Sequence, residues 1–163
     1  MVNVTVPFYS RTARVSKFAS ERLLDSSAPS PARTLPTIEV SWGELIDKIT
    51  ILEIKERRLT SPAAVENVRW ELAALTRVFE GLKPVPAELD ALKRDLKAIN
   101  DALWDIENRT RAKEAAKVFD QEFIELTRSV YLNNDRRAGI KRRINELLNS
   151  GLVEEKQYTS YNV

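Results

Sequence analysis

The alternation of apolar and polar residues predicts a chain that is helical almost throughout beyond an N-terminal segment. The first helix is predicted over residues 41–59, SWGELIDKITILEIKERRL. Ser41 is a candidate N-cap, and Glu44, three residues further on, completes a capping box. Val40 and Leu45 occupy the positions of a hydrophobic staple around this start. The pattern therefore predicts where the helix begins as well as its length.

Two further helices are predicted with clear boundaries. Ser61 and Pro62 have the pattern of an N-cap and a first helical residue, and Gly81 is predicted to end that second helix. After a turn at residues 83–86, a third helix is predicted over residues 86–107. Its apolar residues keep heptad spacing, which predicts packing against another long helix within the chain or in a dimer. This seam consists of Leu89, Leu92, Leu96, Ile99, Leu103 and Ile106.

The C-terminal part of the chain predicts a fourth helix over residues 111–132, with Phe119 among its inward residues, and a fifth over residues 135–149. The polar run NND at residues 133–135 resembles a turn with an N-cap, so we predict a break there. The alternative is one kinked helix, because helical spacing continues across these residues. Gly151 is predicted to end the last helix.

Together these elements predict an all-α fold, a bundle of four to five helices with coiled-coil-like seams over residues 37–150. Residues 1–36 are predicted to be a flexible tail, in which residues 15–24 could form a short helix, and residues 151–163 a C-terminal tail. The first tail holds five basic and two acidic side chains, whereas the rest of the chain holds 21 and 22. Because that body is nearly neutral, we do not expect nucleic-acid binding. No stretch approaches the roughly 18 consecutive apolar residues of a membrane span.

Composition narrows the chemistry. Cysteine and histidine are both absent from the sequence. Their absence removes the thiolate nucleophile, the zinc–thiolate site, the commonest general base and the neutral-pH switch. We therefore expect a cytoplasmic protein without a resident cofactor, and composition leaves open whether the protein is an enzyme.

The predicted first helix carries apolar residues on two faces. One broad apolar arc predicts core packing. The opposite side sets Ile51 and Ile54 among charged residues, so we expect this side to be covered as well, because exposed faces seldom carry two isoleucines. Either the helix is an interface with intrahelical pairs such as Glu44 with Lys48, or it forms the wall of a polar site. The charged residues of this side are Glu44, Asp47, Lys48, Lys55 and Arg58.

Two carboxylate pairs indicate a metal-dependent alternative. Glu44 and Asp47 lie one helical turn apart, as do Glu122 and Glu125, and this spacing suits a hard cation such as Mg²⁺. A four-carboxylate helical site is similar to that of the all-α nucleotide pyrophosphohydrolases, in which an E-x-x-E pair and an E-x-x-D pair hold metal against a triphosphate. The resemblance implies a Mg²⁺-dependent phosphohydrolase-like activity.

The segment over residues 133–145, NNDRRAGIKRRIN, is strongly basic. With a helix break at its start, Arg136 and Arg137 would lie in a first helical turn, where cations oppose the helix dipole. A bound phosphate or carboxylate would compensate, and so would a salt bridge to Glu107 or Glu114. Of these two explanations we favour the salt bridge.

Four stretches together resemble one family: SWGELIDKITILEIKERRL, NVRWELAAL, LWDIENRTRAKEAAKVF and FIELTRSVYLNNDRRAGIKRRINELL. Over residues 40–156 the chain is similar to an uncharacterised bacterial family of small helical domains of unknown function, sometimes encoded near or fused to surface-glycan and glycosyltransferase genes. The resemblance implies a bacterial origin and a role around polysaccharide synthesis, without a mechanism. The first helix is more loosely similar to that of helical chorismate mutases, which implies a cationic wall of Lys48, Lys55 and Arg58.

Two functional hypotheses follow. The leading one is a non-catalytic interaction or accessory module that forms a homodimer through exposed seam residues or binds a helical protein partner. Trp104 lies off the seam, and we expect it to pack against a neighbouring helix. The alternative is a protein that binds phosphate, nucleotide sugar or dicarboxylate, or a Mg²⁺-dependent enzyme. One common cavity lined by Asp47 and Lys48 of the first helix and by Arg137 and Lys141 of the last would be the most informative observation. The candidate ligand-binding residues are Glu44, Asp47, Lys48, Lys55, Glu107, Asn134, Arg137 and Lys141.

Overall fold

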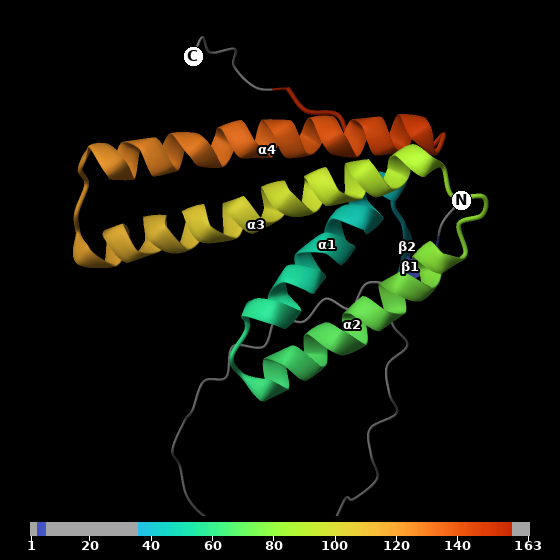
Figure 1. Ribbon diagram of the computed structural model, residues 1–163, viewed down its shortest axis with the longest axis horizontal. Helices are drawn as coiled ribbons and strands as arrows, with labels where there is room; N and C mark the ends of the chain where they lie inside the picture. Colours follow the sequence, from blue (N-terminus) through green and yellow to red (C-terminus); the bar gives the residue numbers. More distant parts are fainter. Residues whose placement is uncertain (1–2, 6–35, 158–163) are drawn as a thin grey trace, which may run out of the picture.

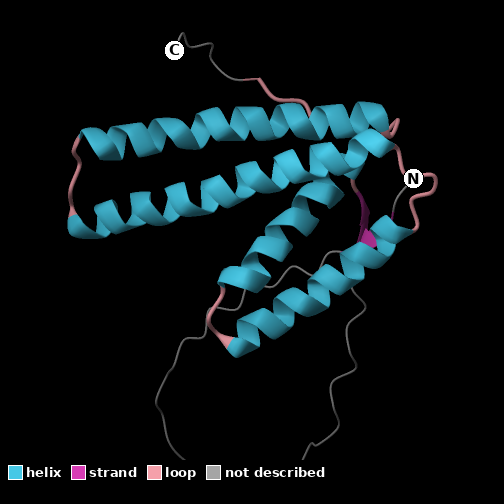
Figure 2. Cartoon of the chain, viewed as in Figure 1, coloured by secondary structure: helices cyan, strands magenta, loops and turns pink. Residues whose placement is uncertain are grey.

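The structure is a computed structural model that describes residues 3–5 and 36–157, and its architecture is all-α, as predicted (Figure 1). Within the described residues, Figure 2 shows helices, one short strand pair, and loops that connect the elements and follow the last helix. Most of the predicted N-terminal tail, with its short helix over residues 15–24, lies outside the described residues. The elements are β1 Asn3–Thr5, β2 Thr37–Glu39, α1 Trp42–Arg58, α2 Pro62–Glu80, α3 Ala87–Ala116 and α4 Gln121–Leu147.

The strand pair was not predicted from the sequence. β1 and β2 run antiparallel, with Val4 opposite Ile38. β2 leads directly into α1, so this pair lies beside the start of the first helix. No helix in the described part of the chain is long and apolar enough to cross a membrane.

Both α1 and α2 begin directly after the predicted N-cap residues, but only Ser41 caps its helix through its side chain. The carboxylate of Glu44, predicted to complete a capping box, binds Lys141 instead. Ser41 precedes α1 in extended conformation, and its Oγ accepts a hydrogen bond from the Glu44 backbone N–H at 3.2 Å. Pro62 is the first residue of α2, directly after Ser61, and Gly81 follows its last residue. These local signals therefore fix the short α1–α2 hairpin.

The core lies on two sides of α1, which confirms that both of its faces are covered. One cluster joins α1 to α2, and a second joins α1 to α3 and α4. Ile54, on the mixed face, is only 2% exposed. Burying a side chain of this size stabilises the fold by about 1.5–3 kcal/mol. The first cluster comprises Leu45, Ile49, Leu52, Val68 and Leu75, and the second comprises Ile46, Leu89, Leu92, Leu96 and Ile144.

The N-terminal turn of α1 is fixed against the C-terminal end of α4. The Gly43 backbone N–H donates to Asn145 Oδ1 at 2.7 Å, and the Trp42 N–H donates to Ser150 Oγ at 3.3 Å. A Cβ on Gly43 would lie 2.7 Å from the Lys141 carbonyl oxygen, so only glycine permits this approach. Side chains distant in sequence thus satisfy backbone donors that the helix itself leaves free.

The predicted division of the C-terminal half into three helices is wrong. α3 continues to Ala116, and α4 runs without a break through residues 133–135, as in the alternative of one continuous helix. The asparagine side chains bond within the helix instead of forming a turn: Asn133 Nδ2 donates to the Ser129 carbonyl at 2.7 Å, and Asn134 Oδ1 accepts from Arg137 at 3.4 Å. The side chains of Asn133 and Asn134 are therefore hydrogen-bonded without a break in the helix.

The true turn lies at residues 117–120. Lys117 adopts the left-handed conformation with φ 55°, and Asp120 caps α4 by accepting from the Phe123 N–H at 3.0 Å. Phe119, predicted to point inward, is 56% exposed in this turn. α4 ends at Leu147, ahead of the predicted end at Gly151, and Asn149 takes a positive φ of 47° just beyond it.

α3 and α4 form one long hairpin, and its turn projects beyond α1 and α2 (Figure 1). The predicted seam of α3 packs within the chain, since Leu89 and Leu96 are fully buried and contact Ile144 of α4 and Ile46 of α1. The seam is therefore not the exposed surface that the dimer hypothesis required.

Candidate functional site

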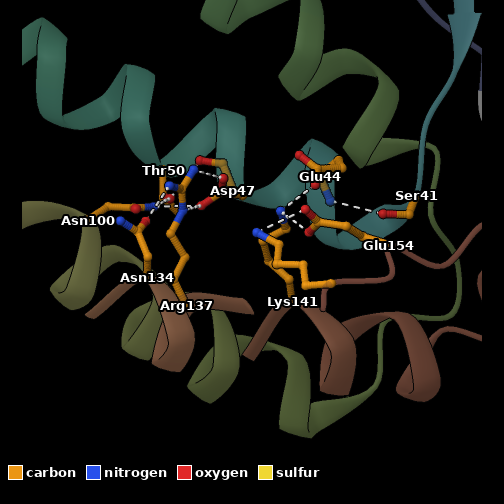
Figure 3. A network of polar contacts seen from close by, with 10 residues as sticks. Ser41, Glu44, Asp47, Thr50, Asn100, Asn134, Arg137, Lys141 and Glu154 are labelled. Carbon is orange, nitrogen blue, oxygen red and sulfur yellow. Dashed lines mark hydrogen bonds and ion pairs between the residues drawn. The ribbon is translucent and has the colours of Figure 1, made fainter. Parts of the chain in front are cut away.

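A buried ion pair joins α1 to α4 (Figure 3). Asp47 is 2% exposed, and both of its carboxylate oxygens accept hydrogen bonds from the Arg137 guanidinium. The Nε bond measures 2.9 Å, and Nη2 binds the other oxygen. This bidentate geometry holds the guanidinium in one orientation.

α3 completes this network through Asn100. Its Nδ2 donates to Asp47 Oδ1 at 2.8 Å and to Thr50 Oγ1 at 2.9 Å. Thr50 in turn donates to the Asp47 carbonyl at 2.8 Å. The hydrogen bond to Asp47 outweighs burial and raises the pKa of Arg137, so this side chain stays charged. Buried polar groups are thereby satisfied across three helices.

A second polar cluster lies one turn further along α4 (Figure 3). The Lys141 side chain is 7% exposed and contacts the carboxylates of Glu44 and Glu154, the latter at 2.8 Å. Burial alone would lower the pKa of Lys141, but hydrogen bonds to Glu154 and Glu44 outweigh it and raise that pKa. Glu154 lies beyond α4, so this cluster also fixes the chain after the last helix.

An open cavity of about 400 Å³ lies beside the Asp47–Arg137 pair, between α1, α3 and α4. Arg137 and Asn100 belong both to the network and to the cavity wall. α3 supplies most of the lining from one of its faces. The lining residues are Ile51, Asn100, Leu103, Trp104, Glu107, Asn108, Arg111, Asn134 and Arg137.

The structure divides the eight predicted site residues into groups. Glu107, Asn134 and Arg137 line the cavity together. Asp47 holds Arg137 in place without lining the cavity. Glu44 and Lys141 form the separate second cluster, and Lys48 and Lys55 do not line the cavity. Asp47, Lys48, Arg137 and Lys141 therefore do not line one common cavity, because only Arg137 of these four lies in its wall.

Two predicted ion pairs are replaced by others. Lys48 lies 3.1 Å from Glu71 of α2, and Glu44 binds Lys141, so the intrahelical pair between Glu44 and Lys48 is wrong. Arg137 does form a salt bridge, but its partner is Asp47 in place of Glu107 or Glu114. The dipole argument fails because Arg137 lies in the interior of α4. The long-range partner instead comes from the crossing of α1 over α4.

The predicted four-carboxylate metal site is not assembled. Glu122 lies at the far end of the α3–α4 hairpin, bound to Arg109 and Lys113 at 2.6 Å each, whereas Asp47 is bound to Arg137 and Asn100. No group of three acidic, histidine or cysteine residues in the described part of the chain has the arrangement of a metal site.

The cationic wall implied by the chorismate mutase likeness is also not formed. Arg58 reaches α3, where its Nε donates to Asp101 at 3.1 Å, whereas Lys48 faces α2. The two side chains therefore neutralise carboxylates on different neighbours.

Sequence reasoning missed the α3 contribution to the cavity. Asn100, Trp104, Asn108 and Arg111 recur at helical spacing beside the apolar seam, and this polar stripe with one tryptophan was the available signal. Trp104 lines the cavity, where helix packing had been expected.

The fold and this geometry define an all-α protein in which an α1–α2 hairpin packs against an α3–α4 hairpin, with an open polar cavity between α1, α3 and α4. The chain belongs to a family described as Family of unknown function (DUF6165), whose model matches residues 36–162. This membership confirms the resemblance to a family of unknown function. No curated protein and no solved structure matches the chain.

Proposed function

We propose that the protein is a non-catalytic binding module that takes a small polar ligand into the α1–α3–α4 cavity. The observation that carries this proposal is Arg137, which a buried carboxylate presents at the cavity wall in a fixed orientation. A binding group whose rotamer is already fixed loses little entropy when the ligand arrives. The cavity volume also falls in the usual range for ligand pockets.

The charged groups of both polar clusters support binding over proton transfer. A general acid or base works best with a pKa near the working pH. Here the pKa values of Arg137 and Lys141 are raised, away from neutral pH, so both side chains stay protonated there. Histidine and cysteine are absent from the sequence. The side chains are suited to holding a ligand in place.

A thermal unfolding screen tests this function. The probes are neutral sugars, sugar phosphates, nucleotide sugars and dicarboxylates, with and without Mg²⁺. A ligand at 100 times its Kd stabilises the folded state by about 2.7 kcal/mol. The rim variant Arg111→Ala should reduce the response, whereas Arg69→Ala, an exposed control on α2, should keep it. A complete screen without any stabilisation would contradict the proposal.

A second candidate function, self-association, is favoured by the tip of the α3–α4 hairpin. Val118, Phe119 and Ile124 are exposed by 42%, 56% and 42%, and we name these three residues the tip patch. Phe119 packs edge-on against Phe123 with 5.2 Å between ring centroids, and this contact holds the Phe119 ring in its orientation. Clustered exposed apolar side chains commonly mark interaction surfaces.

The charges around the tip patch favour a second copy of the chain as its occupant. Residues 107–128 hold five basic and five acidic side chains. Pairs such as Arg109 with Glu122 and Lys113 with Asp120 satisfy charges within the chain. A surface that is already neutral offers no attraction to a strongly acidic or basic partner, but it can meet its own copy around a two-fold axis.

Sedimentation velocity tests this assembly. Phe119→Ser should convert a dimer into a monomer with little change in Tm, because Phe119 is exposed in the single chain. Trp70→Ser is the matched control, since Trp70 is also 56% exposed but lies on α2. A wild-type protein that stays monomeric at high concentration would exclude this candidate.

A further inference from the structure

The cavity is formally charge-balanced, although two arginines line it. Arg111 Nη2 lies 3.1 Å from Glu107 Oε2, and Arg137 is bound by Asp47. An anion entering the cavity would therefore approach arginines that already have carboxylate partners. It would also lie beside Glu107, which repels it, and it could not displace the buried Asp47 without leaving that carboxylate unpaired.

Several lining groups present hydrogen-bond acceptors to a ligand. Asn100 uses its Nδ2 for Asp47 and Thr50, which leaves its Oδ1 as an acceptor. Asn108 uses its Nδ2 for the Trp104 carbonyl, at 2.9 Å, which likewise leaves Oδ1. Together with the Glu107 carboxylate, these acceptors have nothing to gain from phosphate or a dicarboxylate in its ionised form.

Other lining groups present hydrogen-bond donors to a ligand. Asn134 Oδ1 accepts from Arg137 Nη1 at 3.4 Å, so the Asn134 amide nitrogen remains as a donor. Arg137 Nη1 and the Arg111 guanidinium at the rim add further N–H groups. Because the charges of the lining already balance, a cationic ligand such as a polyamine also finds no unpaired carboxylate among these ion pairs.

The apolar lining residues are Ile51, Leu103 and Trp104. An aromatic ring beside mixed donors and acceptors suits a ligand with an apolar C–H face and polar edges. A hydroxyl group both donates and accepts, so it can bond to either kind of lining group. We infer that the cavity binds a neutral, hydroxyl-rich ligand, a sugar or polyol, and this inference rests on the proposed binding function.

Saturation-transfer NMR and calorimetry with defined probes test this ligand class. The neutral probes are glucose, galactose, N-acetylglucosamine and myo-inositol; the charged probes are glucose 6-phosphate, succinate and putrescine. We expect a neutral probe to bind most tightly, with a Kd that is nearly independent of salt because no net charge is neutralised. Asn108→Ala and Asn134→Ala should each weaken it roughly three- to tenfold, as expected for one lost hydrogen bond.

The outcomes separate this inference from the proposed function. If glucose 6-phosphate or succinate binds more tightly than every neutral probe and salt weakens that binding, the ligand class is wrong while the binding module stands. Binding of a neutral probe that both alanine variants leave unchanged places it outside the cavity and overturns the inference. If none of the probes binds and the broader thermal screen is also negative, the proposed function itself fails.

Discussion

The buried pair of Asp47 and Arg137 allows the cost of removing each partner to be predicted separately. The Asp47 side chain is 3% exposed and that of Arg137 is 27% exposed. Arg137→Gln leaves a buried carboxylate without its counter-ion, which should cost about 3–5 kcal/mol. Asp47→Asn leaves a guanidinium that still reaches the water of the cavity, so we expect a smaller loss of about 1–3 kcal/mol.

Urea unfolding followed by circular dichroism measures these losses in the two single variants and in the double variant. Because both partners belong to one network, the double variant should lose about 1–3 kcal/mol less than the sum of the single losses. Arg69→Gln removes an exposed ion pair with Glu56 and should change the free energy of unfolding by no more than about 0.5 kcal/mol. Strictly additive losses would show that Asp47 and Arg137 are not coupled, and a larger loss for Asp47→Asn than for Arg137→Gln would show that the carboxylate does not depend more strongly on its partner than the guanidinium does.

Two further predictions concern the contacts of α1 with α4 and with α3. Gly43→Ala should lower the free energy of unfolding by about 1–3 kcal/mol, because the new Cβ would meet the Lys141 carbonyl; an unchanged urea midpoint would contradict this close approach. Burial raises the pKa of Glu53, but hydrogen bonds from Lys97 and Lys93 outweigh it and lower that pKa. The stability that Glu53 contributes is therefore full above about pH 4.3, its unfolded-state pKa, and is lost as the pH falls through the folded value, so Glu53→Gln should flatten this part of the acid unfolding curve.

The α1–α2 hairpin could be predicted from sequence because its boundaries are set by local chemistry. Ser41 and Ser61 stand where the helices begin, and Gly81 follows the end of the second. The expectation that α1 is covered on both sides also came from the sequence, since Ile54 among charges is unfavourable on a solvated face.

The α3–α4 hairpin could not be divided correctly because the true turn lacks the usual signals. Lys117 takes the left-handed conformation without being glycine, and no proline follows it before α4. Meanwhile Asn133 and Asn134 resembled a turn, yet bond to groups of their own helix. The sequence did hold one usable signal, because aspartate is among the residues preferred at N-caps and Asp120 caps α4 by accepting from the Phe123 N–H.

The site was only partly predictable, because its partners come together through the crossing of helices. Asp47 and Arg137 were both candidates on chemical grounds, but their contact spans 90 residues of sequence. The sequence predicted that Trp104 packs against a neighbouring helix, although it lines the cavity. The sequence of one helix does not show which of its sides the other helices leave uncovered.

A ¹⁵N–¹H NMR titration with the neutral sugar or polyol that binds best shows whether the cavity holds a neutral, hydroxyl-rich ligand. If this proposal is correct, we expect saturable shifts of the Trp104 indole N–H and of the Asn108 and Asn134 side-chain amides, while the Trp70 indole on α2 stays unchanged. Saturable shifts centred on Trp70 that leave the Trp104 indole unmoved, or no saturable shift at any of these groups, would contradict it.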